Sequence, residues 1–233
     1  MPRRWRAGPG DRRPPDRAVT AAGPEELAGE AGFAVIDVET TGFSPGRDRI
    51  VELAVVLVGV DGREQGAFAT LLDPGCDPGP THVHGITPGQ LVGAPTFDEV
   101  QPYLAALLSG RVVVGHNVAR FDLAFVREEC RRTGGDALVV GEVPLVDTMT
   151  VGRDRLGLYG RAKLVDCCDH FGITWEDHHS ALGDARATAS LCAAMRGTLG
   201  DGSLGIPDLL VRAQAIRWPG ADPGRRVVAR PRA

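Results

Sequence analysis

Residues 33–40 read FAVIDVET, an apolar run that ends in two acidic positions. Its Phe, Val and Ile content predicts a buried strand. The next apolar run, RIVELAVVLV at 49–58, predicts a second strand. Asp61-Gly62 is a hairpin signal that leads into a third strand at about 65–72. The core therefore opens, near Gly32, as an antiparallel meander.

The following residues alternate between helical and strand patterns. After a Pro- and Gly-rich loop at 73–90, Thr96 and Glu99 predict a capping box for a helix that ends at Leu108. We then expect strands at 111–115 and 144–151, and helices at 121–132, 163–172 and 180–199. Because strands that alternate with helices pair in parallel, the sequence predicts one α/β domain with a mixed sheet.

The two ends of the chain differ from this core. Residues 1–30 mix Pro, Gly, Arg and Glu without apolar periodicity, which predicts a disordered extension. The core is expected at 31–199, followed at 200–233 by a short amphipathic helix and a flexible tail. The apolar runs are far shorter than the roughly 20 residues of a membrane span, and no apolar segment follows the N-terminal arginines. We expect a cytoplasmic protein without a membrane association.

The cysteines do not form a recognisable site. The five of them, an odd number, include no C-x-x-C pair, which argues against a zinc knuckle and against a disulfide scaffold. We expect them to be reduced and mostly buried.

Three short segments carry residues suited to chemistry. Asp37 and Glu39 lie two apart in the first strand, so their side chains share a face. Burying two unpaired charges side by side is costly, which favours neutralisation by cations. The alternative is a strand end whose acids are solvated.

The second and third segments are ambiguous when taken alone. Asp122 opens a helix after the strand that ends at Gly115, a place where ligands commonly bind, but an acid also favours the first turn of any helix. His179 precedes a helix that contains Asp184, whose small neighbours would leave space for an ion or a substrate. The alternative is a polar helix start, and Asp177 and His178 compete with His179.

Together these segments resemble one family, the 3′–5′ exonucleases with four acids and a histidine (DEDDh), in the style of proofreading subunits and of ribonuclease T. The matching motifs are DVETTG at 37–42, HN…FDLAFV at 116–126 and HSALGDARAT at 179–188, with VHGIT at 83–87 and LVDT at 145–148. The resemblance covers roughly residues 32–198. It implies a ribonuclease H-like fold, a mixed five-stranded sheet flanked by helices in a single domain.

The resemblance also implies roles for individual residues. It makes four acids the ligands of two divalent cations, Mg²⁺ or Mn²⁺, and His179 the general base: Asp37, Glu39, Asp122 and Asp184. A second set would line the pocket for the terminal nucleotide: Thr40, Thr41, His84, Asn117 and Phe121. His84 is preferred over His82 because it directly precedes Gly-Ile-Thr. Three residues separate Asn117 from Phe121, where proofreading members usually have two, and Asp136 and Asp147 are not expected to be ligands.

The implied function is removal of nucleoside 5′-monophosphates from the 3′ end of a nucleic acid, with single-stranded DNA favoured and a role in proofreading or repair. The alternatives are an RNA-trimming exonuclease and a catalytically silent accessory subunit of a polymerase. The expected partner is a nucleic acid with a free 3′ end. A polymerase is a further candidate partner, and the oligomeric state is left open.

The charge distribution bears on this function. The formal net charge is −4, but residues 1–20 and 220–233 hold ten Arg and three Asp, which leaves 16 basic and 27 acidic residues between them. Such a negative body is unusual for a protein that binds a polyanion, unless bound cations reverse the sign locally. The Arg-rich ends are expected to add a weak, sequence-independent attraction to the backbone.

Overall fold

The computed structural model describes residues 31–134, 142–160, 162–175 and 177–219, together with residues 221 and 230. The expectations for residues 1–30 and for most of the C-terminal tail fall outside this part of the chain. The strands are β1 (Gly32–Thr40), β2 (Ile50–Gly59), β3 (Glu64–Leu71), β4 (Val112–Gly115) and β5 (Leu145–Asp147). The helices are α2 (Thr81–His84), α3 (Pro88–Leu91), α4 (Phe97–Leu108), α5 (Asp122–Arg132), α6 (Thr148–Leu156), α7 (Leu164–His170), α8 (Ala181–Leu199) and α9 (Ile206–Gln214).

The strands within the described residues form one mixed sheet of five, in the order β3-β2-β1-β4-β5. β2 pairs antiparallel with β1 on one side and with β3 on the other, as expected for a meander. β4 pairs parallel with β1 and with β5, as expected where strands alternate with helices. The predicted ribonuclease H-like α/β architecture is therefore confirmed.

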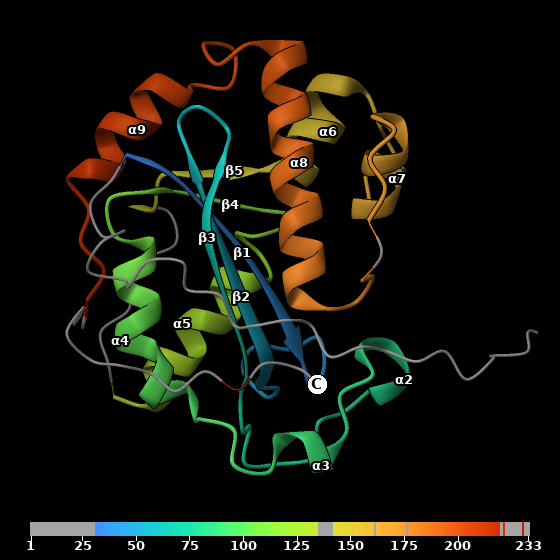
Figure 1. The fold of residues 1–233 in the computed structure, drawn as a ribbon, viewed down its shortest axis with the longest axis vertical. Helices are drawn as coiled ribbons and strands as arrows, with labels where there is room; N and C mark the ends of the chain where they lie inside the picture. The colour runs from blue at the N-terminus through green and yellow to red at the C-terminus, as the bar shows by residue number, and fades with distance from the viewer. Residues whose placement is uncertain are drawn as a thin grey trace, which may run out of the picture.

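Alternation along β1 divides the core into two layers. Ala34, Ile36 and Val38 pack with residues of α4 and α5 on one face of the sheet. Phe33 and Val35 pack with residues of α8 on the other face, where Figure 1 shows this long helix crossing the strands. Because side chains of a strand alternate with a period of two, the next odd positions of β1 continue toward the α8 face.

One predicted strand is too long. The segment 144–151 is a strand only as far as Asp147, and α6 begins at Thr148. The reason is local: the Asp147 carboxylate accepts hydrogen bonds from the backbone N–H groups of Met149 at 3.1 Å and Thr150 at 3.3 Å, so it caps the helix. The predicted capping box of Thr96 and Glu99 at the start of α4 is present.

Other local predictions lie closer to the observed structure. The loop expected at 73–90 contains the two short helices α2 and α3. The short helix expected within 200–233 is α9, which ends at Gln214. All five cysteines are free, and only Cys76 is exposed. Among the described residues, no helix has the length and apolar content that crossing a bilayer requires.

An ion pair with one buried partner fixes α5 against the sheet. Glu129, which is 1% exposed, accepts two hydrogen bonds from the Arg49 guanidinium, at 2.8 and 2.9 Å, and one from the backbone N–H of Ile50. Arg49 also donates to the Pro74 carbonyl at 2.9 Å. Arg132 lies 3.3 Å from Glu129, on the same helix. This cluster joins the start of β2 to the helix that carries Asp122.

Replacing Glu129 by Ala is therefore expected to destabilise the protein by about 1–3 kcal/mol, because the buried backbone N–H of Ile50 and the partly exposed Arg49 guanidinium both lose their acceptor. The matched control is Glu128→Ala, because Glu128 pairs with Arg131, whose side chain is 69% exposed. That change is expected to leave stability nearly unchanged, as for other surface pairs. Urea denaturation of both variants measures the difference, and equal losses would contradict the anchoring role of Glu129.

Candidate active site

The two acids of β1 lie on the face of the sheet that α8 covers. Asp37 and Glu39 follow Phe33 and Val35 in the same alternating row. The pairing of β1 with β4 ends at Val35, so the acids lie on the part of β1 that extends beyond its parallel neighbour. Both side chains are half-buried. The extension leaves room beside β1 for a group from another element.

Asp122 occupies that place. As the first residue of α5, it directs a carboxylate oxygen to the backbone N–H of Val38, which donates to it at 3.1 Å. Asp122 is 3% exposed, and this burial raises the pKa of its carboxyl group to about 8. The Val38 hydrogen bond opposes the rise, while the negative charge of Asp147 adds to it. The bond places Asp122 at the backbone position between Asp37 and Glu39.

Asp184 approaches from the opposite layer, on the first turn of α8. Ser180 caps this helix by accepting a hydrogen bond from the Gly183 N–H at 3.1 Å. The indole N–H of Trp175 donates to an Asp184 carboxylate oxygen at 2.9 Å. Burial raises the pKa of Asp184, while the Trp175 hydrogen bond and the nearby His179 and His178 lower it.

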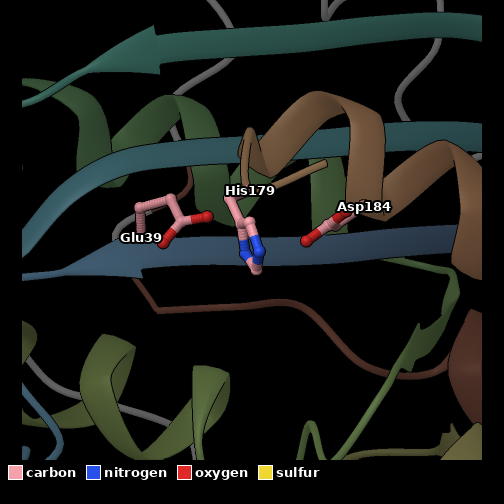
Figure 2. A group of neighbouring side chains, drawn as sticks. All are labelled: Glu39, His179 and Asp184. Atoms are coloured by element: carbon pink, nitrogen blue, oxygen red, sulfur yellow. The ribbon is translucent and has the colours of Figure 1, made fainter. Parts of the chain in front are cut away.

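His179 projects into the space between these acids. Figure 2 shows its imidazole ring between the carboxylates of Glu39 and Asp184. The three side chains each offer a ligand atom, and these atoms lie within 4.8 Å of one another. His179 is exposed and has a φ of 62°, a left-handed conformation that is uncommon outside glycine. Strained backbone of this kind is concentrated at functional sites.

The small residues around Asp184 have a different role from the expected one. A Cβ atom at Gly183 would overlap the backbone carbonyl oxygen of Asp177, so this glycine permits close packing of the 177–179 segment on α8. Ala185 and Ala187 are buried in the core, at 0% and 2% exposure. The expectation that these neighbours leave space for an ion or a substrate was therefore wrong. Gly183 instead lets the chain that bears His179 lie next to the helix.

Electrostatics show how closely the acids gather. Burial raises the pKa of Asp37 well above its ordinary value, and the negative charges of Asp122, Asp184, Glu39 and Glu52 raise it further. The other three acids singled out from the sequence thus all act on Asp37. Carboxylates that repel in this way need protons or cations to coexist.

Glu52 is the fifth carboxylate in this group, and the sequence patterns did not single it out. It lies opposite Glu39 in the β1–β2 register and is 3% exposed. Its carboxylate accepts a hydrogen bond at 3.1 Å from the backbone N–H of Ala181, the first residue of α8. The available signal was one acid in the otherwise apolar run of β2. Its contact ties the helix that carries Asp184 to the strand next to β1.

Four of the five residues expected to line a nucleotide pocket lie around the end of β1 and the start of α5. The Thr40 hydroxyl donates to the Gly42 carbonyl at 2.6 Å, and the Thr41 hydroxyl accepts from the Arg49 N–H at 3.0 Å. Asn117 has a φ of 65°, and half-buried Phe121 contacts Phe125 with ring centroids 5.0 Å apart. Their contact with a substrate stays a prediction.

His84 and His82 differ sharply in environment. His84 is 1% exposed, accepts a hydrogen bond from the Ile86 N–H at 3.0 Å and lies 3.2 Å from the Pro78 carbonyl oxygen through its other ring nitrogen. His82 is exposed. In this arrangement His84 organises the loop that carries α2, and its expected contact with the terminal nucleotide stays a prediction.

Asp147 supports the site from one layer further out. Besides capping α6, its carboxylate accepts a hydrogen bond at 3.0 Å from the backbone N–H of Asn117. It therefore holds the turn between β4 and α5. Asp147, which is not among the expected ligands, thus has a structural role. Asp136 lies outside the described residues.

Similarity to known proteins agrees with this geometry. Residues 34–192 match the family model described as exonuclease. A DNA polymerase III of the PolC type from Clostridium perfringens is 35% identical over 161 residues, which are 68% of this chain and 11% of that protein. The corresponding protein of Caldanaerobacter subterraneus is 30% identical over 182 residues, 77% of this chain and 13% of that protein. The chain thus corresponds to a small part of these polymerases.

Several solved structures have a fold similar to that of this chain. Escherichia coli exonuclease I in complex with a dT13 oligonucleotide has a TM-score of 0.63 and 21% identity, over 72% of this chain and 41% of that chain. Exonuclease I from Methylocaldum szegediense has a TM-score of 0.61 and 22% identity, over 77% of this chain and 42% of that chain. The family match extends over more than half of the sequence and includes every acid of the cluster. This chain therefore belongs to the exonuclease family, in its DEDDh branch with four acids and a histidine.

Proposed function

We propose that this chain is a metal-dependent 3′–5′ exonuclease that releases nucleoside 5′-monophosphates, with single-stranded DNA as its substrate. One observation carries the proposal: acids from β1, α5 and α8 meet beside one exposed histidine. Residues this far apart in sequence gain nothing structurally from mutual repulsion. A shared ligand for the carboxylates explains their convergence.

The donor set fits hard divalent cations. The site offers carboxylate oxygens from Asp37, Glu39, Asp122 and Asp184, and no described cysteine belongs to the cluster. Oxygen-rich ligation of this kind selects Mg²⁺ or Mn²⁺. Two such ions, when bound, would lower the pKa of a water molecule and stabilise the leaving oxygen of the phosphodiester.

His179 is suited to the role of general base. Its ring is exposed, while Asp122 is buried and Asp184 is half-buried, so it can reach a water molecule at the mouth of the site. Histidine is the side chain that most readily exchanges a proton near neutral pH. The packing of the 177–179 segment on Gly183 holds the ring beside the acids.

The preference for DNA rests on the relatives. The proteins that share 30–35% identity are named DNA polymerases III, and a structurally similar exonuclease I is described in complex with a dT13 oligonucleotide. A part of a polymerase with exonuclease chemistry fits a proofreading or repair task. Association of this chain with a polymerase is part of the same proposal.

The central test measures the release of a 3′-terminal label from DNA and RNA strands of matched sequence. We expect the loss of single nucleoside 5′-monophosphates from DNA with Mg²⁺ or Mn²⁺, and no reaction in excess chelator. Faster degradation of RNA would replace the DNA assignment with RNA trimming. No reaction on either strand with metal would support a silent binding subunit instead.

Replacing Asp184 by Ala is expected to abolish turnover without unfolding the protein, because the change removes one of several mutually repelling charges. Circular dichroism in chelator checks the fold, and single-turnover assays measure the rate. Asp169→Ala is the control, since Asp169 is exposed on neighbouring α7. Retention of activity in Asp184→Ala would refute the assignment of this residue.

His179→Ala is expected to slow hydrolysis by roughly 10²- to 10⁴-fold at saturating metal, the usual contribution of a positioned base. His178→Ala is the matched control. The His178 ring lies against Trp175, with centroids 4.2 Å apart, rather than among the three ligand atoms. If His178→Ala gives the larger loss, the two histidines have been assigned in the wrong order.

The raised carboxyl pKa values predict an unusual pH dependence of stability. Asp37, Asp122 and Asp184 hold protons more tightly in the folded chain, because burial raises the pKa of each, to about 8 for Asp122. Their unfolded forms lose protons near pH 4. In chelator, this contribution to stability is therefore fully present below about pH 4 and is lost as the pH rises toward 8.

Denaturation in urea at pH 5.5 and pH 8.0 measures this effect. The fall in stability between the two values is expected to shrink in Asp122→Asn and to remain in Asp169→Asn, which removes the same charge from an exposed position. Saturating Mg²⁺ is also expected to reduce the fall, because bound cations favour the ionised carboxylates. Equal pH dependence in the two variants would contradict the explanation.

A further inference from the structure

Trp175 links the candidate metal site to the packed core beside it. Its ring packs against a cluster of buried side chains from α7 and α8, which includes Cys168 and Leu191. Its indole N–H donates to the Asp184 carboxylate at 2.9 Å. The same ring contacts His178, the residue before His179, with centroids 4.2 Å apart. One side chain therefore contacts the core, an acid of the site and the segment that bears the histidine.

The chemistry of an indole suits it to orient a carboxylate ligand. The N–H group is a donor only, and it carries no charge that would compete with a cation. It engages one oxygen of Asp184, and the backbone of His179 also hydrogen-bonds this carboxylate, whose remaining lone pairs stay available for ligation. Because the ring is fixed by packing, the hydrogen bond restricts the rotation of the Asp184 side chain. Aromatic N–H groups that are partly buried generally need such a partner.

We propose that Trp175 is a positioning residue for metal binding, which holds the Asp184 carboxylate in its ligating orientation through the indole N–H. This inference rests on the proposed function. In this role Trp175 acts through Asp184, and it needs no contact with the substrate or with a reacting atom. Hydrogen-bond partners of metal ligands typically contribute about 10- to 100-fold to metal affinity or activity.

Trp175→Phe tests the proposal because it keeps an aromatic ring and removes the N–H donor. Calorimetric titration of the full chain with Mn²⁺ is expected to show about 10- to 100-fold weaker binding than in the original chain. The rate is expected to recover at sufficiently high Mn²⁺, so the change appears in the metal requirement. The melting temperature in chelator is expected to stay close to that of the original chain. Unchanged Mn²⁺ affinity in Trp175→Phe would overturn the proposal.

Two further variants separate the N–H donor from its surroundings. His178→Ala removes the ring contact but leaves the N–H, and its Mn²⁺ affinity is expected to exceed that of Trp175→Phe clearly. Equal weakening in both variants would overturn the role of the N–H and point to packing of the 177–179 segment. Asp184→Ala is expected to abolish the same binding event. If the original chain binds no Mn²⁺, or Asp184→Ala binds it normally, the proposed function fails together with this inference.

A measurement on the original chain avoids any dependence on the folding of a variant. In nuclear magnetic resonance spectra, substoichiometric Mn²⁺ is expected to broaden the indole N–H signal of Trp175 before that of Trp218, which is buried in the layer of α4 and α5. Loss of one indole signal in Trp175→Phe assigns the resonance. A Trp175 signal that stays sharp while Mn²⁺ binds would place the cation elsewhere and overturn the proposal.

Discussion

Repulsion between carboxylates, and the neutral donors that hold them despite it, determine the architecture around β1. The backbone N–H of Val38 holds Asp122, the backbone N–H of Ala181 holds Glu52, and the indole of Trp175 holds Asp184. These donors fix orientation but add no positive charge. The cluster consequently keeps its demand for cations, which an arginine in the same place would have satisfied. Under the proposed function, bound cations would make an acidic protein body compatible with a polyanionic substrate.

Much of this arrangement followed from the periodicity of the sequence. The two-residue spacing of Asp37 and Glu39 within an apolar strand placed both on one face, and the structure shows that face turned toward α8. The meander, the parallel half of the sheet and the capping box at Thr96 also followed from local patterns. The resemblance to a known family then connected β1 with Asp122 and Asp184, which periodicity alone left ambiguous.

The features that escaped prediction depend on contacts between distant segments. The pattern at 144–151 is compatible with a strand, and the capping hydrogen bonds of Asp147 end it early. In the sequence, Glu52 is one acid among apolar residues, and its role depends on the hydrogen bond that the start of α8 donates to it. The role of Gly183 is apparent only from the Asp177 backbone, which packs against it. Sequence patterns identify which residues lie on a face, but not what approaches that face.

The pairing of Glu39 with Glu52 in the β1–β2 register couples assembly to chemistry. A slip of one residue between these strands would send every side chain of one strand to the opposite face. The acids would then enter the apolar layer of α4 and α5, where their burial is costly. Misregistered intermediates would thus be unstable, and they would lack the cluster of acids proposed to bind metal. Correct alignment of the strands is therefore a condition for nuclease activity, and the chain acquires its fold and its activity together.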